Sequence, residues 1–210
     1  MTRLYFVRHG ESNMNLMPDI IGGRSNHTEL TEKGVRQAKA FGRWLADSSL
    51  RPDVIYFSPA VRTIQTMDYS LEAAGIDTVE RIMDLRIQEL SQGINEGAPR
   101  RETYTPEVLA QIAEQLLDFK FDDGESIQDV MDRKLEFALD MANKHPDQTV
   151  LVYSHGFAIR SLAGAINALP HHDIVKVLET PNVSLSSFHV TPESQSVKYV
   201  GKRVIDEESV

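Results

Sequence analysis

The stretch L-Y-F-V-R-H-G-E-S, residues 4–12, decides the fold. A run of β-favouring residues closed by a glycine is typical of a strand that enters a tight turn. Side chains just before such a turn lie at the carboxyl edge of the strand, where open α/β sheets bind their ligands. Arg8 and His9 occupy this place. An arginine beside a histidine predicts an anionic ligand and a group that can attack it.

The same ending occurs a second time. The most apolar strand, Thr149–Tyr153, runs into Ser154-His155-Gly156 and then into a helical stretch. A third strand, Val54–Phe57, precedes Ser58-Pro59, where serine as N-cap and proline at the first helical position predict a helix start. Arg62 would then lie in the first turn of that helix, near the edge that carries His155.

The remaining pattern is one of alternating strands and helices, which predicts an α/β sheet with helices on both faces. We expect one domain over residues 1–210, a three-layer sandwich with a mostly parallel sheet and an excursion at 88–123 near the active site. A long loop is expected at 13–28. Further helices are expected at 31–45, 105–117, 126–141 and 156–166, further strands at 78–82, 185–190 and 197–200, and a frayed tail at 205–210.

Composition excludes several classes of function. The chain contains no cysteine, so disulfides, thiolate catalysis and cysteine-bound zinc are excluded, and a cytoplasmic location is expected. The start of the chain does not resemble a signal peptide. The net charge of −9 argues against nucleic acid or an anionic membrane as partner. An anionic ligand would therefore have to be attracted by a local cluster of arginines.

Such a cluster follows if Arg8, His9, Arg62 and His155 end neighbouring strands. Two guanidinium groups can bind phosphoryl oxygens in a forked geometry. Nearby cations favour a neutral imidazole, which is a competent nucleophile toward phosphorus. A departing alkoxide needs a proton, so an acid is expected on the far side.

Five motifs in order make the whole chain, from Leu4 to about Val190, resemble the histidine phosphatase superfamily, also called phosphoglycerate mutase-like. The motifs are Arg8-His9-Gly10-Glu11-Ser12 with Asn15; Leu30-Thr31 with Gly34, Gln37 and Ala38; Ser58-Pro59 with Arg62-Thr63 and Gln65-Thr66; Glu89 with Gly93 and Glu96-Gly97; and Gly124-Glu125-Ser126 followed by Ser154-His155-Gly156. The resemblance implies that His9 becomes phosphohistidine, that Glu89 donates the proton and that His155 is the second active-site histidine. It also implies that Arg8 and Arg62 bind phosphate.

Other candidates are less constrained. Asn15, Gly22 and Arg24 are expected to bind substrate, although Arg24 could equally serve only the solubility of its loop. Glu89 could be an ordinary solvated carboxylate. The family often has tryptophan at position 95, where this chain has asparagine, and residues 21–24 depart from the mutase pattern. These departures leave the substrate open.

No metal and no cofactor are expected, because the pair His171-His172 lacks further ligands at zinc spacing. The predicted function is a metal-independent phosphatase, on the phosphatase branch of the family, that hydrolyses small phosphate monoesters through a phosphohistidine on His9. The partner would be a small phosphorylated metabolite, and a homodimer is left open. The alternative is a cofactor-dependent phosphoglycerate mutase, which the short segment 98–123 disfavours. A catalytically dead binding module would require a missing catalytic residue, and none is missing.

Overall fold

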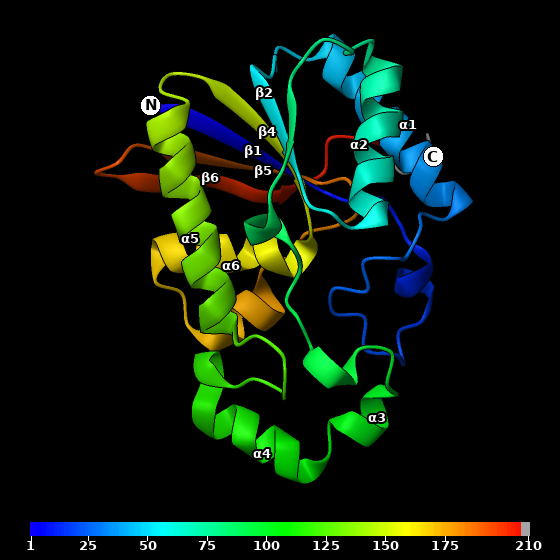
Figure 1. The fold of residues 1–210 in the computed structure, drawn as a ribbon, viewed down its shortest axis with the longest axis vertical. Coiled ribbons are helices and arrows are strands. Elements are labelled where there is room, and N and C mark those ends of the chain that lie inside the picture. Colours follow the sequence, from blue (N-terminus) through cyan, green and yellow to red (C-terminus); the bar gives the residue numbers. More distant parts are fainter. Residues whose placement is uncertain (207–210) are drawn as a thin grey trace.

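The computed structural model describes residues 1–206 and contains a six-stranded sheet in the order β3-β2-β4-β1-β5-β6 (Figure 1). Neighbouring strands from β3 to β1 are parallel, β5 is antiparallel to β1, and β6 is antiparallel to β5. The expected mostly parallel sheet is therefore confirmed. The strands are β1 (Thr2–Arg8), β2 (Val54–Phe57), β3 (Arg81–Met83), β4 (Thr149–Ser154), β5 (Leu185–Val190) and β6 (Gln195–Lys202).

Helices cover both faces of the sheet. Because successive residues of a strand point to opposite faces, each strand contributes side chains to an apolar core on either side. On one face, Phe6 of β1 and Val152 of β4 share an apolar core with Phe137. On the other, Val7 and Tyr153 share a core with residues of α1 and α2. The sandwich thus has three layers, as expected. The covering helices are α1 (Glu32–Asp47) and α2 (Val61–Ala74) on one face, and α5 (Ile127–Lys144) and α6 (Gly156–Asn167) on the other.

The excursion between β3 and α5 extends from one end of the sandwich, at the bottom of Figure 1. Its two α-helices are short, and neither contains a buried residue. The excursion thus adds little to the core and forms a wall beside the sheet edge. It consists of α3 (Arg100–Thr103), α4 (Pro106–Gln115) and 3₁₀ turns at Leu85–Ile87, Gly93–Asn95 and Leu116–Asp118. Outside it, a 3₁₀ turn at Asn13–Leu16 and a π-helical turn at Asp173–Val177 complete the chain.

Local sequence signals placed most element ends correctly, with one exception at Ser58. Gly75 ends α2 in the left-handed region with φ 68°, and Ser126 starts α5 with a capping box. However, α2 begins at Val61 with Ala60 as its N-cap, so the expected cap on Ser58 and the expected place of Pro59 at the first helical position are both wrong. The hydroxyl of Ser58 instead contacts Nε2 of His155 at 2.8 Å.

Three further sequence expectations differ from the structure or lie outside it. The strand expected at 78–82 is β3, which begins three residues later and ends at Met83, and α3 was not expected at all. Of the expected frayed tail, residues 207–210 lie outside the described residues. Within the described part, no helix is long and apolar enough to cross a membrane.

One buried side chain is expected to destabilise the fold. Lys134 of α5 is fully buried, and its Nζ lies 4.3 Å from the centre of the Phe6 ring with no hydrogen-bond partner among the described residues. Desolvation lowers the pKa of Lys134 well below its usual value. An unpaired polar group in an apolar core costs about 1–3 kcal/mol. We therefore expect Lys134→Met to raise the free energy of unfolding at pH 7 by about that amount.

Urea denaturation at several pH values checks this expectation. The gain should shrink as pH rises toward 10.5, because the lysine of the unfolded chain then also loses its charge. The matched control is Lys144→Met on the same helix, where the ammonium is exposed and pairs with Asp140 at 2.9 Å. The control should change stability little. If Lys134→Met were no more stable than the parent protein, the buried amine would not be unpaired, and the prediction would be contradicted.

Candidate active site

His9 directly follows β1, which ends at Arg8, and is 4% exposed. Its Nδ1 lies 2.7 Å from the carbonyl oxygen of Gly10. Because a carbonyl oxygen can only accept, Nδ1 carries the proton of the neutral ring and Nε2 keeps its lone pair. The backbone on both sides is held too: Gly10 N–H donates to Oγ1 of Thr66 at 3.0 Å, and the Asn182 amide donates to the His9 carbonyl at 3.0 Å. The ring is thus presented as a nucleophile with its reactive nitrogen defined.

The turn after His9 requires two glycines. A Cβ on Gly10 would lie 2.6 Å from the carbonyl oxygen of Gly34, and a Cβ on Gly34 would overlap the carbonyl oxygen of Glu11. The turn therefore packs backbone against backbone on the first turn of α1. This close approach explains why both motifs carry glycine there.

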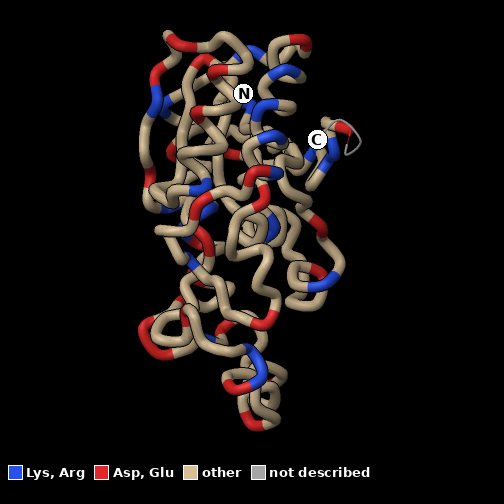
Figure 2. The backbone as a smooth tube through the Cα atoms, turned by 90° about the vertical axis from the view of Figure 1, so that its right-hand side faces the viewer, with Lys and Arg blue, Asp and Glu red and all other residues tan. Residues whose placement is uncertain are grey.

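The surroundings of His9 keep its imidazole neutral. Burial lowers the pKa of His9 well below 6.5, and the positive charges of Arg62 and Arg8 lower it further. A neutral imidazole at physiological pH has the free electron pair that nucleophilic attack requires. The net charge of the chain is −9, and Figure 2 shows acidic and basic residues interspersed along the backbone. The positive environment of His9 is therefore local.

Two arginines flank His9 and line the same cleft. Arg8 donates from Nη1 to the carbonyl oxygen of Thr180 at 2.7 Å, while its buried Nε has no hydrogen-bond partner among the described residues. Arg62 donates from Nη1 to the carbonyl oxygen of Ser25 at 2.9 Å. Burial lowers the pKa of Arg62 to about 10, so it stays charged at neutral pH. Unpaired N–H groups of this kind can be satisfied by a bound anion.

His155 lies behind Arg62 rather than in the cleft. It is fully buried, and its ring centre is 5.4 Å from that of His9. Nδ1 accepts a hydrogen bond from Nη2 of Arg62 at 3.0 Å, so the proton of the neutral ring is on Nε2 and is donated to Ser58 Oγ. The structure brings His155 to the site as expected, but in contact with a phosphate-binding candidate rather than with the cleft. In this arrangement it orients Arg62.

Glu89 lies at the N-terminus of α6, where helices favour negative groups. Its Oε1 accepts from the N–H of Ala158 at 2.9 Å and of Leu90 at 3.0 Å, and its Oε2 accepts from Phe157 N–H at 3.1 Å. Glu89 is half-buried and lines the cleft, so it is not an ordinary solvated carboxylate. Arg133 fixes this segment by donating to the carbonyl oxygens of Arg86, Gln88 and Glu89 at 2.7, 2.8 and 3.0 Å.

The expected substrate loop is only partly in the cleft. Asn15 and Gly22 line it, whereas Arg24 does not. Arg24 instead forms an ion pair with Glu125 at 3.0 Å, and its Nε lies 3.4 Å from the Glu89 carbonyl oxygen. In this arrangement Arg24 ties the loop to the segment that carries Glu89.

A second tie between these segments is the carboxylate of Glu96. It accepts from the N–H groups of Arg24 at 2.8 Å, Gln92 at 3.1 Å and Ser25 at 3.1 Å. The Glu96-Gly97 part of the acid motif is therefore structural. It joins the two loops that border the site.

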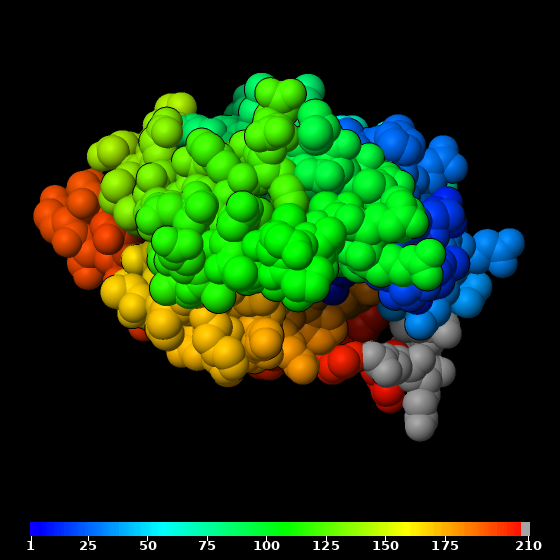
Figure 3. Space-filling model, turned by 90° about the horizontal axis from the view of Figure 1, so that it is seen from below, coloured from blue at the N-terminus to red at the C-terminus, as the bar shows by residue number. Residues whose placement is uncertain are grey.

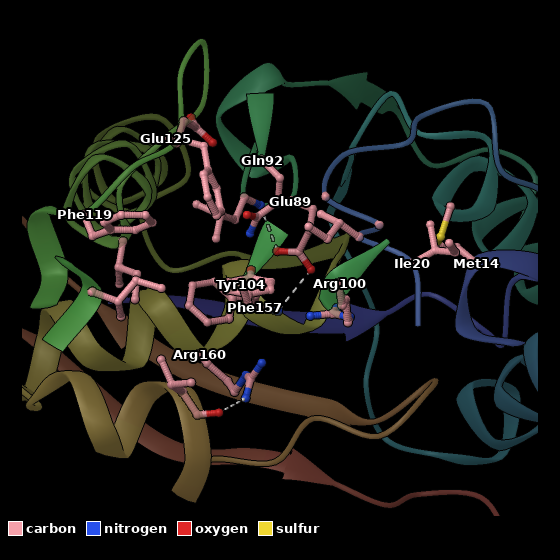
Figure 4. Close-up of a pocket in the computed structure, with 18 of the residues that line it drawn as sticks. Met14, Ile20, Glu89, Gln92, Arg100, Tyr104, Phe119, Glu125, Phe157 and Arg160 are labelled. Atoms are coloured by element: carbon pink, nitrogen blue, oxygen red, sulfur yellow. Dashed lines mark hydrogen bonds between the residues drawn. The ribbon is translucent and has the colours of Figure 1, made fainter. Parts of the chain in front are cut away.

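The cleft has a volume of about 860 Å³, far more than a phosphate group occupies. In Figure 3, seen from below, the green excursion overhangs the yellow-to-orange segment after β4, and dark blue atoms of the N-terminal part show in the gap between them. Figure 4 shows Glu89 between Phe119 at one end of the pocket and Met14 and Ile20 at the other. The excursion thus forms one wall of the cleft, opposite the loop that follows His9.

Sequence reasoning missed several residues of the site. Arg160 lines the cleft from α6 and donates to the carbonyl oxygens of Val175 at 3.1 Å and Leu178 at 3.2 Å. Its place one helical turn after Gly156 was the available signal. Arg133 and Asn182 contact backbone groups and left no local signal, and Thr66 stood in the third motif without an assigned role. Among the described residues no cluster of three or more His, Asp or Glu side chains could hold a metal ion.

Comparison with known proteins agrees with this geometry. The family model described as "Histidine phosphatase superfamily (branch 1)" matches residues 4–203. The chain is 30% identical over 197 residues to a 2,3-bisphosphoglycerate-dependent phosphoglycerate mutase of Chelativorans sp., covering 91% of this chain and 93% of that one. It is 33% identical over 168 residues to phosphoserine phosphatase 1 of Hydrogenobacter thermophilus, covering 79% and 76%.

Solved structures show the same fold. Bacillus stearothermophilus YhfR superposes with a TM-score of 0.82 and 25% identity, over 97% of this chain and 98% of that one. The sequence relatives include both phosphoglycerate mutases and a phosphoserine phosphatase. Because the family model spans almost the whole chain, this protein belongs to the histidine phosphatase superfamily (branch 1).

Proposed function

We propose that this protein is a phosphatase that hydrolyses phosphate monoesters through a phosphohistidine on His9, without a metal or another cofactor. The observation that carries the proposal is the buried, neutral His9, whose Nδ1 is bound to the Gly10 carbonyl and whose Nε2 has no hydrogen-bond partner among the described residues, beside two cleft-lining arginines. Such a ring can attack phosphorus directly, and the guanidinium groups stabilise the charge that builds on the phosphoryl oxygens.

The proposed reaction has two steps. In the first, Nε2 of His9 forms a bond to phosphorus while the bond to the alcohol oxygen breaks, and Glu89 gives that oxygen a proton. In the second, water attacks phosphorus, Glu89 takes the water proton, and the P–N bond breaks and returns its electron pair to His9. Arg8 and Arg62 hold the phosphoryl oxygens throughout. His155 keeps Arg62 in place, and Asn15 and Gly22 border the bound ester.

The alternative function is a mutase, which the curated relatives keep open. A mutase must keep water from its phosphorylated intermediate. Here the wall of the cleft is itself accessible to water, since Leu109 is 53% and Leu116 48% exposed. This openness supports hydrolysis over isomerisation.

The decisive measurement compares the two reactions in the same preparation. We expect release of free phosphate from p-nitrophenyl phosphate to exceed any interconversion of 3- and 2-phosphoglycerate, also after priming with 2,3-bisphosphoglycerate. Activity should be unchanged in excess chelator. A mutase rate far above the hydrolysis rate would reverse the order of the two functions. Activity lost to chelator and restored by zinc or magnesium would refute the metal-free mechanism.

A further inference from the structure

Among the described residues, no other element buries the apolar face of α4. Leu109, Ile112, Ala113 and Leu116 follow helical spacing, continue into the turn after α4 and all line the cleft. Helices with such a stripe ordinarily bury it against a core. No residue of α4 is buried, however, so the stripe borders the cavity instead.

Aromatic rings extend this apolar surface toward the sheet. Tyr104 and Phe119 each pack edge-to-face on Phe121, with ring centres 5.7 and 5.1 Å apart. All three rings line the cleft, and Phe157 lines it from α6. Figure 4 shows Phe119 on one side of Glu89 and Met14 and Ile20 on the other, so the proton donor lies within this apolar lining.

Several cations that border the cleft are already engaged. Arg100 stacks on the ring of Tyr104 at 6.0 Å, and Lys120 pairs with Asp129 at 3.4 Å. Arg160 is bound to two carbonyl oxygens. Lys176 also lines the cleft and is exposed, so the preference for hydrocarbon follows from the apolar stripe and the aromatic rings, not from a lack of cations.

The apolar wall and the phosphate-binding residues belong to one cavity, which also contains His9, Arg8, Arg62 and Glu89. We infer that the substrates are phosphate monoesters of bulky apolar or aromatic alcohols, whose hydrocarbon part covers the stripe of α4. This inference rests on the proposed phosphatase function and goes beyond it. The substrate is then larger and more apolar than the small metabolite that the sequence suggested.

A series of n-alkyl phosphates from ethyl to octyl, kept below micelle-forming concentrations, tests the inference. Transfer of one methylene group out of water is worth about a fourfold change in binding. We expect kcat/KM to rise by about two- to fourfold per added methylene. Propyl phosphate should exceed glycerol 3-phosphate, which has the same carbon chain with two added hydroxyls.

Two variants of α4 locate the effect. Leu109→Asp should lower the ratio of octyl to ethyl phosphate turnover by at least about tenfold, because it puts a charge into the apolar wall. The matched control Gln111→Asp adds the same charge to the same helix outside the cleft lining and should keep the ratio. Since α4 has no buried residue, both variants should retain the Tm of the parent.

The outcomes separate the inference from the function on which it rests. A flat or falling chain-length series with measurable phosphate release would refute the apolar substrate class and leave the phosphatase standing. An equal loss on both esters in Leu109→Asp would likewise refute it. No phosphate release from any ester would refute the phosphatase proposal itself.

Discussion

His9→Ala is expected to lose phosphate release by on the order of 10⁴-fold or more and to lose covalent labelling completely. In the proposed intermediate, phosphorus is bonded to Nε2 of His9. Alanine has no side-chain atom that could form this bond. Neighbouring side chains do not replace it: His155 is fully buried, and its Nδ1 is bound to Arg62. The loss should therefore not be partial.

Labelling with a ³²P-phosphoryl donor, followed by acid and alkali treatment, measures the intermediate directly. The parent protein should carry an acid-labile, alkali-stable label. The control is His27→Ala, which changes an exposed histidine outside the cleft lining and should label normally. A stable label on His9→Ala would mean that another residue is the nucleophile.

Glu89→Gln is expected to slow hydrolysis according to how strongly the leaving group needs a proton. General acid catalysis is typically worth about 10²–10⁴-fold. The loss should be of that size for 2-phenylethyl phosphate, because its leaving group is a strongly basic alkoxide. It should be much smaller for p-nitrophenyl phosphate, because p-nitrophenolate can depart without a proton. Both esters carry one aromatic ring, so binding in the cleft is matched.

Single-turnover phosphate release under conditions where chemistry limits the rate is the measurement. Arg62→Ala provides the contrast, because it removes stabilisation of the phosphoryl charge and should slow both esters by similar factors. Equal losses in Glu89→Gln would place the acid elsewhere. The other nearby carboxylates are all engaged: Glu125 pairs with Arg24 at 3.0 Å and with Arg133 at 2.9 Å, Glu11 pairs with Lys33 at 3.1 Å, and Glu96 holds three backbone N–H groups.

The sequence was sufficient for the parts of the site that local rules determine. Arg8 ends a strand, His9 follows it directly, and His155 follows a neighbouring parallel strand, so their convergence at one sheet edge follows from topology. The position of Arg62 was predicted from a helix start that follows a third strand, which places this residue in the first turn of the helix. These placements depend on strand and helix signals within a few residues of each side chain.

Long-range pairing could not be predicted in the same way. The hydroxyl of Ser58 binds His155, which is 97 residues away, and this competes with the cap that the local sequence suggests. Whether Arg24 binds substrate or pairs with Glu125 likewise depends on how two loops that are distant in the sequence pack together. The stripe of α4 has the same spacing whether it covers a core or a cavity. Only the structure shows which of these holds.

The weak attachment of α4 has a consequence for how this family diversifies. A helix without buried residues can exchange its apolar side chains at little cost in folding stability, because surface substitutions rarely exceed a few tenths of a kcal/mol. The residues proposed to bind the phosphoryl group and to attack it, Arg8, His9 and Arg62, lie at the end of β1 and in the first turn of α2, within the sandwich. Substitutions on α4 can therefore change which phosphate esters bind, while the residues proposed for phosphoryl transfer stay the same. Relatives that share about a third of their residues could in this way come to serve different metabolic steps.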